Sequence, residues 1–167
     1  MTPFDRAKDP AAPGTNIGHV HLRVGDLARA IAFYRDVIGL NVTQRYGESA
    51  AFLSADGYHH HIGLNTWDSL GSGPPPNGHT GLYHTAFLFP SRPALAQAIK
   101  RALDAGVRLT GMADHGVSEA VYMDDPDGNG VELYRDKPRA VWPADEAGYL
   151  AMINAPLDLE DLLTDAL

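Results

Sequence analysis

The chain has 167 residues, of which 44% are hydrophobic and 20% charged, as expected of one soluble domain or of one domain built from two similar halves. A net charge of −8, with 13 Lys and Arg residues scattered along the chain, argues against a nucleic-acid-binding face, which needs clustered cations. No cysteine is present and no apolar run approaches about 18 residues, so disulfides, thiolate metal sites and a membrane span are excluded, and a cytoplasmic location is expected.

The first half is expected over residues 17–67, after a polar N-terminal extension (residues 1–16) without the apolar core of a signal peptide. A helix is predicted because Asp26 can cap its start, apolar residues recur at helical spacing and Gly39 can end it. Short alternating runs predict the strands around it. The expected elements are a strand over 18–24, a helix over 27–38 and strands over 41–46, 50–55 and 58–66.

The second half repeats this order over residues 82–136, after a Gly- and Pro-rich linker at residues 68–81. Ser91 precedes its helix and Gly106 ends it. Each half would expose one apolar sheet face, so the two halves must pack together. The expected elements are a strand over 82–87, a helix over 94–105 and strands over 107–110, 119–123 and 131–134.

The single domain is therefore expected over residues 17–138, followed by a Pro-punctuated C-terminal tail over residues 139–167. The apolar spacing in the tail predicts a short helix over 159–167. This helix would dock on the body of the domain or on a second subunit, and the sequence favours neither arrangement.

Two histidines and one glutamate stand out in this repeat. His19 and His84 each open the first strand of a half, about 65 residues apart, and Glu132 lies in the last strand of the second half. Two imidazoles and one carboxylate can hold iron(II) and leave open positions for a substrate and oxygen. The bland alternative is that all three are packed or solvated residues. The repeat favours a metal site.

The segment Asp125–Gly130 resembles the start of an EF-hand calcium loop, with Asp136 at its end. A calcium loop needs helices on both sides and usually ends in Glu. Here strands are predicted on both sides, and Pro126 occupies the second position. We interpret the segment as a tight turn that aims Glu132 at the metal.

With the repeat and these ligands in hand, the chain resembles the vicinal oxygen chelate superfamily, which includes glyoxalases, bleomycin-resistance proteins and type I extradiol dioxygenases. The resemblance covers most of the chain, residues 17–138. It implies an α+β fold of two βαβββ repeats. The phrases that carry it are Gly18-His19-Val20, Phe33-Tyr34-Arg35-Asp36 with Ile38-Gly39-Leu40, and Asp125-Pro126-Asp127-Gly128-Asn129-Gly130-Val131-Glu132.

Within the superfamily, the dioxygenase pattern fits best. The resemblance implies that the metal ligands are His19, His84 and Glu132. Glyoxalase I usually adds a fourth ligand at the position taken here by Gly63, which has no side chain to bind a metal. This departure counts against glyoxalase I.

The resemblance also implies three catalytic residues. His60, three residues before Gly63, is the acid-base candidate, although strand alternation would instead place His59 and His61 on the Gly63 face. The other two candidates are Tyr122, ten residues before Glu132, and His115, which would donate hydrogen bonds to the substrate or to oxygen. The interval between these two is two residues shorter than the family pattern. Apolar wall candidates are Leu64, Trp67 and Phe87.

The implied activity is extradiol cleavage of a catechol-type aromatic by dioxygen, with Fe(II) as the expected metal and Mn(II) as the alternative. A non-oxidative isomerase, epimerase or lyase of the same fold, holding Zn(II) or Ni(II), is a second interpretation. A metal-free protein that binds a drug or metabolite is a third. The partners expected are a small aromatic diol, dioxygen and a second copy of the chain in a homodimer.

Overall fold

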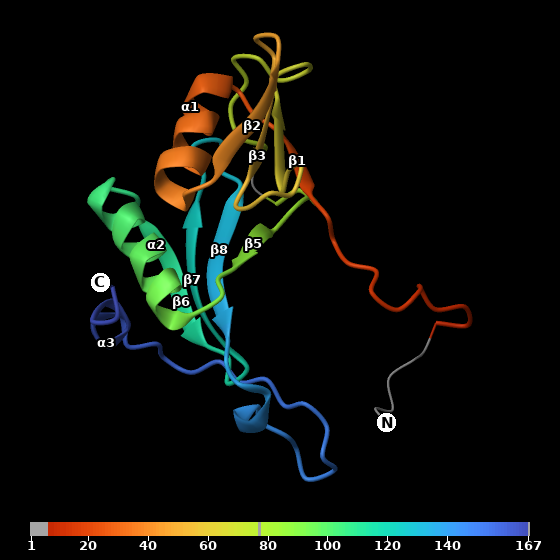
Figure 1. Cartoon of the computed structure of the whole chain (residues 1–167), viewed down its shortest axis with the longest axis vertical. Coiled ribbons are helices and arrows are strands. Elements are labelled where there is room, and N and C mark those ends of the chain that lie inside the picture. Colours follow the sequence, from red (N-terminus) through yellow and green to blue (C-terminus); the bar gives the residue numbers. More distant parts are fainter. Residues whose placement is uncertain (1–6, 77, 167) are drawn as a thin grey trace.

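The computed structural model describes residues 7–76 and 78–166 and contains two four-stranded sheets, each with a helix on one face (Figure 1). This is the predicted α+β arrangement of two βαβββ repeats. The first repeat comprises β1 (Val20–Arg23), α1 (Leu27–Ala32), a π-helical turn η1 (Phe33–Ile38), β2 (Asn41–Tyr46), β3 (Ala50–Ser54) and β4 (Ile62–Asn65). The second comprises β5 (His84–Leu88), α2 (Arg92–Asp104), β6 (Leu109–Asp114), β7 (Ser118–Asp124) and β8 (Gly130–Asp136).

The strand order is the same in both sheets, β1-β4-β3-β2 and β5-β8-β7-β6. The first and last strands of each repeat pair in parallel, with His21 opposite Gly63 in the first sheet and Ala86 opposite Glu132 in the second. Gly63 and Glu132 therefore occupy equivalent positions. His19 and His84 are equivalent in the same way, although β1 begins one residue after His19.

The predicted helix ends are present, but the first helix is not uniform. Asp26 accepts a hydrogen bond from the Arg29 N–H at the start of α1, and Gly39 ends the helical segment with a φ of 96°. Between them, the chain widens into the π-helical turn η1. This turn keeps four side chains buried, including Tyr34, and aims the Tyr34 hydroxyl at the second half.

The apolar core lies between the sheets and the helices. One face of each sheet packs under the helices. The helix α2 of the second half also contacts η1 of the first half, so the two halves share one apolar core. Burial of these side chains supplies the main driving force for folding. Fully buried members include Leu53, Ile62 and Leu64 of the first sheet, Leu95 and Ile99 of α2, and Val121, Met123 and Leu133 of the second sheet.

The turn between β7 and β8 also clamps the two halves together. The Tyr34 hydroxyl donates to Asp125 Oδ2 at 2.9 Å, and the Gly25 N–H donates to Asp127 Oδ1 at 2.8 Å. Arg29 forms an ion pair with Asp127 at 2.8 Å. Strands flank this turn, and its carboxylates accept hydrogen bonds from N–H groups of the protein. Both features agree with the interpretation of the segment as a tight turn and not a calcium loop.

The segment predicted as a strand over 58–66 is shorter than expected. Residues 56–61 form a bend in which Asp56 Oδ1 accepts from the Tyr58 N–H at 2.8 Å, so β4 starts only at Ile62. The Asp-Gly pair at 56–57 explains the difference because these residues favour turns over strands.

The C-terminal tail docks on the body of its own chain. It contains a short 3₁₀ turn η2 (Arg139–Val141) and α3 (Leu159–Leu163), which packs against α2 with Leu162 fully buried. Arg92 on α2 holds this helix through Asp161 at 2.7 Å and Asp165 at 2.9 Å. Of the two arrangements that the sequence left open, the structure shows docking on the body.

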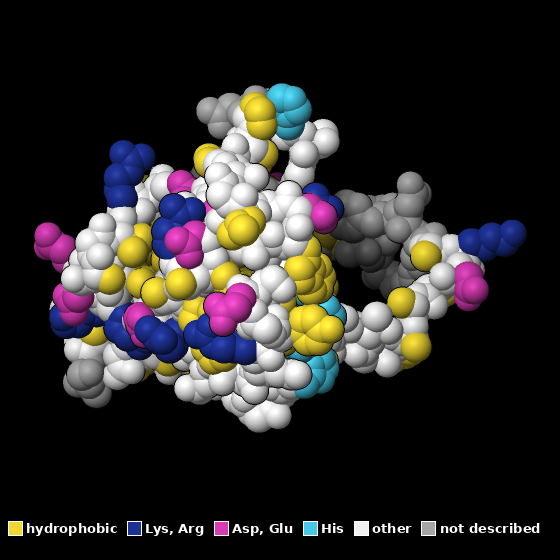
Figure 2. Space-filling view, turned by 90° about the horizontal axis from the view of Figure 1, so that it is seen from above, with side chains coloured by type: hydrophobic (Ala, Val, Ile, Leu, Met, Phe, Trp, Pro, Cys, Tyr) yellow, Lys and Arg dark blue, Asp and Glu magenta, His cyan; other side chains and the backbone are white. Residues whose placement is uncertain are grey.

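On the face seen from above, Lys and Arg side chains lie beside Asp and Glu side chains and do not form a basic patch (Figure 2). Within residues 7–76 and 78–166, no helix is long and apolar enough to cross a membrane.

Candidate metal centre and pocket

Two of the three predicted metal ligands meet on the open face of the second sheet. His84 opens β5 and Glu132 lies on the neighbouring parallel strand β8. Their side chains approach each other, with 2.9 Å between His84 Nε2 and Glu132 Oε2, and the carboxylate side chain is 12% exposed. The parallel register therefore places an imidazole and a nearly buried carboxylate side by side.

Tyr122 joins this pair from the next strand. It lies directly opposite Glu132 in the antiparallel pairing of β7 and β8, and its hydroxyl donates to Glu132 Oε1 at 3.2 Å. Burial, together with the negative charge of Glu132, raises the pKa of Tyr122 to about 12. The phenol therefore stays protonated at neutral pH and can act as a hydrogen-bond donor.

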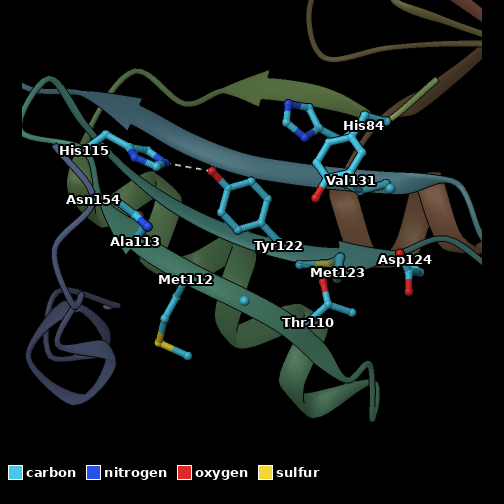
Figure 3. Close-up of a pocket in the computed structure, with 13 residues that line it drawn as sticks. His84, Thr110, Met112, Ala113, His115, Tyr122, Met123, Asp124, Val131 and Asn154 are labelled. Carbon is cyan, nitrogen blue, oxygen red and sulfur yellow. Dashed lines mark hydrogen bonds between the residues drawn. The ribbon is translucent and has the colours of Figure 1, made fainter. Parts of the chain in front are cut away.

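His115 extends the same network (Figure 3). Its Nε2 atom lies 2.8 Å from the Tyr122 hydroxyl. Its other ring nitrogen, Nδ1, lies 3.1 Å from the carbonyl oxygen of Ile153 in the C-terminal tail. His84, Glu132, Tyr122 and His115 thus form one continuous chain of polar contacts.

A cavity of about 570 Å³ opens beside this chain (Figure 3). The sequence did not indicate several of its lining residues. Thr110 and Met112 lie two residues apart on β6, so strand alternation could have identified them. Asn154 comes from the tail, where no periodic pattern pointed to it. The cavity is lined by Tyr83, His84, Thr110, Gly111, Met112, Ala113, His115, Tyr122, Met123, Asp124, Gly130, Val131 and Asn154.

The third predicted ligand, His19, lies with a different group of side chains. It is exposed, and the centre of its ring lies 4.4 Å from that of His60. His60 also packs against Phe52 on β3, with ring centres 4.9 Å apart. His19 and His60 thus sit together on the first half of the molecule.

The contacts of the histidine triple distinguish its three members. His61 Nδ1 accepts a hydrogen bond from the Ala55 N–H at 3.3 Å, so this ring stabilises the bend at residues 56–61. His59 contacts His60, with 2.8 Å between their Nδ1 atoms, and is exposed. His60 faces His19, and burial together with the neighbouring histidines His19 and His59 lowers its pKa.

The structure does not bring all three predicted ligands together. Among the described residues, no three His, Asp or Glu side chains lie where they could jointly hold a metal ion. His84 and Glu132 nonetheless fit a metal as a pair, because two adjacent ligands at about 2.1 Å from an ion lie about 3 Å apart. His84 Nδ1 is buried without a hydrogen-bond partner among the described residues. A metal-bound histidine usually donates its second ring N–H to a carboxylate or a backbone carbonyl, and the described residues supply no such acceptor for His84.

Gly63 leaves the position equivalent to Glu132 without a side chain, as the sequence indicated. A Cβ atom there would lie 2.9 Å from the His21 ring, which covers the glycine. The prediction that Leu64 and Phe87 line the substrate pocket was wrong. Leu64 is fully buried in the core, and the Phe87 ring packs toward that of Tyr34, because both side chains point to the helix side of their sheets.

Comparisons with known proteins identify the family of this chain. Residues 16–133 match the model of the Glyoxalase/Bleomycin resistance protein/Dioxygenase superfamily. A catechol-2,3-dioxygenase of Bacillus subtilis is 40% identical over 91% of this chain and 52% of its own length. A biphenyl-2,3-diol 1,2-dioxygenase of Rhodococcus globerulus is 33% identical over 72% of this chain and 63% of its own length. The chain thus spans roughly half to two thirds of these relatives.

A lactoylglutathione lyase of Haemophilus influenzae is 27% identical over 71% of this chain and 91% of its own length. A solved glyoxalase/dioxygenase structure from Nostoc punctiforme superimposes with a TM-score of 0.64 at 20% identity, covering 80% of this chain and all of that one. The family match, the dioxygenase relatives and the paired βαβββ repeats lead to one conclusion: the chain belongs to the glyoxalase/bleomycin resistance protein/dioxygenase superfamily, also known as the vicinal oxygen chelate superfamily.

Proposed function

We propose that this chain is a metal-dependent extradiol ring-cleaving dioxygenase that acts on a catechol-type aromatic. The observation that carries the proposal is the polar chain from His84 through Glu132 and Tyr122 to His115. Its three members other than Glu132 line a cavity large enough for a small aromatic ring. The 40% identity to a catechol-2,3-dioxygenase supports it.

In this proposal, His84 and Glu132 hold the metal and His19 is the third ligand. Because imidazole and carboxylate donors suit iron and manganese, Fe(II) is the proposed metal and Mn(II) the alternative. When bound, the metal would supply open positions for both hydroxyl oxygens of the catechol and for dioxygen. His19 would have to approach the other two ligands, since the structure holds it beside His60.

The surrounding residues would handle protons. Tyr122, protonated at neutral pH, would turn its one O–H from Glu132 to a substrate oxygen in the cavity, and His115 would orient that phenol. His60, with its lowered pKa, stays neutral at pH 7 and could take a proton from a catechol hydroxyl near His19.

The test is oxygen uptake on a panel of catechols after anaerobic loading with Fe(II), together with absorbance of the conjugated ring-opened product. We expect uptake and colour in the wild type, loss of both in His84→Ala and a strong reduction in His60→Ala. His79→Ala, at an exposed histidine of the linker, is the control and should retain activity. An iron-loaded protein that consumes no oxygen on any catechol would refute the proposal.

A second candidate is a metal-dependent isomerase or lyase. The observation that favours it is the similarity to lactoylglutathione lyases of Haemophilus influenzae and Neisseria meningitidis, at 27% and 30% identity. Gly63 weighs against it because it offers no fourth ligand. Tight binding of Zn(II) or Ni(II), with turnover of a glutathione hemithioacetal and no oxygen uptake, would establish this candidate.

We further propose that the protein forms a homodimer. Several large apolar side chains are exposed, including Trp67 at 58%, Leu70 at 78% and Tyr83 at 89%. On the face seen from above, hydrophobic side chains gather beside histidines (Figure 2). A mass of about 36 kDa by light scattering, twice the 18.0 kDa of the chain, would support the dimer, and 18.0 kDa at micromolar concentration would refute it.

A further inference from the structure

The C-terminal tail forms a short antiparallel pairing with the end of β6, next to the candidate site. Asp114 and Ala155 exchange two backbone hydrogen bonds, each 2.9 Å long. One step along, the Ile153 N–H donates to the His115 carbonyl oxygen at 3.1 Å. Residues 151–155, which we name the strap, therefore run directly beside His115.

The strap also contacts the His115 side chain. The Ile153 carbonyl oxygen lies 3.1 Å from His115 Nδ1. A carbonyl can only accept a hydrogen bond, so Nδ1 must carry the ring proton. With the proton on Nδ1, Nε2 of the neutral ring can only accept, so the single phenolic proton of Tyr122 lies between two acceptors, His115 Nε2 at 2.8 Å and Glu132 Oε1 at 3.2 Å. One backbone carbonyl thus determines which way the His115–Tyr122 hydrogen bond runs.

Close packing holds the strap in place. A Cβ atom on Gly116, whose φ is 75°, would lie 2.7 Å from Pro143 and 3.1 Å from the Ile153 side chain, so the tail packs against bare backbone there. The Ala151 N–H donates to the Pro143 carbonyl oxygen at 2.9 Å. Beyond the strap, Arg92 anchors α3 and the residues after it through Asp161 and Asp165.

We propose that the strap is a positioning element for His115: the Ile153 carbonyl fixes the tautomer and the orientation of the ring, while Asn154 closes part of the cavity wall. The catalytic consequence rests on the proposed dioxygenase function. The structural consequence, a single His115 tautomer with the proton on Nδ1, does not. A tail remote in sequence would thus control the hydrogen-bond donor, Tyr122, that faces the substrate.

The test measures the tautomer directly in the metal-free, full-length protein. Long-range ¹H–¹⁵N NMR of the imidazole rings, with His115→Gln used to identify the His115 signals, should show the Nδ1–H tautomer in the wild type at pH 8. Ile153→Pro removes the N–H that pairs with His115, and Ala155→Pro removes the N–H that pairs with Asp114. Both should convert His115 to a mixture of tautomers.

Met152→Pro is the matched control. Met152 is 59% exposed, and its N–H donates to no residue in the described chain. This variant should keep the wild-type His115 spectrum. Unchanged His115 signals in both strap variants, or an equal change in Met152→Pro, would overturn the proposal.

Kinetics separate this inference from the proposed function. In the Fe(II)-loaded enzyme, Ile153→Pro should lower kcat on a catechol by about tenfold or more, because the misaligned ring loses part of an acid–base contribution of about 10²–10⁴-fold. KM should change less than kcat. Absence of oxygen uptake in the wild type would refute the dioxygenase function, whereas the NMR result would still decide whether the strap fixes His115.

Discussion

Replacing Tyr34 by Phe tests the clamp between the two halves. Tyr34 is fully buried, and its hydroxyl donates to Asp125 Oδ2 at 2.9 Å. A hydrogen bond to a charged group contributes about 1.5–3 kcal/mol. Asp125 keeps the N–H donors of Asp127 and Asn129, so the loss should be about 2 kcal/mol. At about 2–4 °C per kcal/mol for a chain of this size, Tm should fall by about 4–8 °C.

Urea denaturation followed by circular dichroism gives the free energy of unfolding. The midpoint should fall while the slope stays constant, since the same surface is exposed on unfolding. Tyr46→Phe is the control because Tyr46 is 66% exposed, and it should change stability by less than about 0.5 kcal/mol. If Tyr34→Phe is equally neutral, the turn does not clamp the halves and the reasoning fails.

Three further changes have defined outcomes. Arg92→Met leaves Glu119, whose side chain is 9% exposed, with Arg135 as its remaining partner. The free energy of unfolding should therefore fall by about 1–2 kcal/mol, and limited proteolysis should cleave the tail faster. Burial raises the pKa of Asp114, but Lys137 and a backbone N–H outweigh it and lower the pKa overall. The ionised carboxylate therefore stabilises the fold at pH values above the pKa that Asp114 has in the unfolded chain, and this stability is lost as pH falls below about 4. Urea titrations at pH 3–5 should show a shallower loss of stability in Asp114→Asn than in the wild type. Tyr122→Phe should lower kcat for catechol cleavage by about tenfold or more with intact iron binding, and unchanged kcat would contradict the donor role.

The parts of the site that follow strand geometry were predictable from the sequence. His84 and Glu132 meet because β5 and β8 pair in parallel, and Tyr122 joins them because β7 returns antiparallel beside β8. The turn after β7 sets the β7–β8 register locally, whereas the pairing of β5 with β8 joins strands remote in sequence and was expected from the repeat and from the resemblance to the superfamily. The capping residues Asp26 and Ser91 were also predictable, since each makes a short-range hydrogen bond to its own helix.

Other features depend on tertiary packing that no local pattern expresses. The π-helical turn at Phe33–Ile38 has the same apolar spacing as an ordinary helix, so periodicity could not reveal it. The place of His19 depends on how the two sheets meet, and the strand that was to hold it begins one residue later. The strap around Ile153 lies in a tail with neither alternation nor helical spacing, and its contact with His115 spans 38 residues.

The iron content of each chain after anaerobic loading and desalting tests the proposed metal centre most directly. We expect about one iron per chain in the wild type and in His21→Gln, whose ring covers Gly63 and is not a proposed ligand. His84→Gln, Glu132→Gln and His19→Gln should each lose most of the iron. Equal iron in the wild type and in the His84 and Glu132 variants would contradict the metal centre, and full retention in His19→Gln would remove that residue from the ligand set.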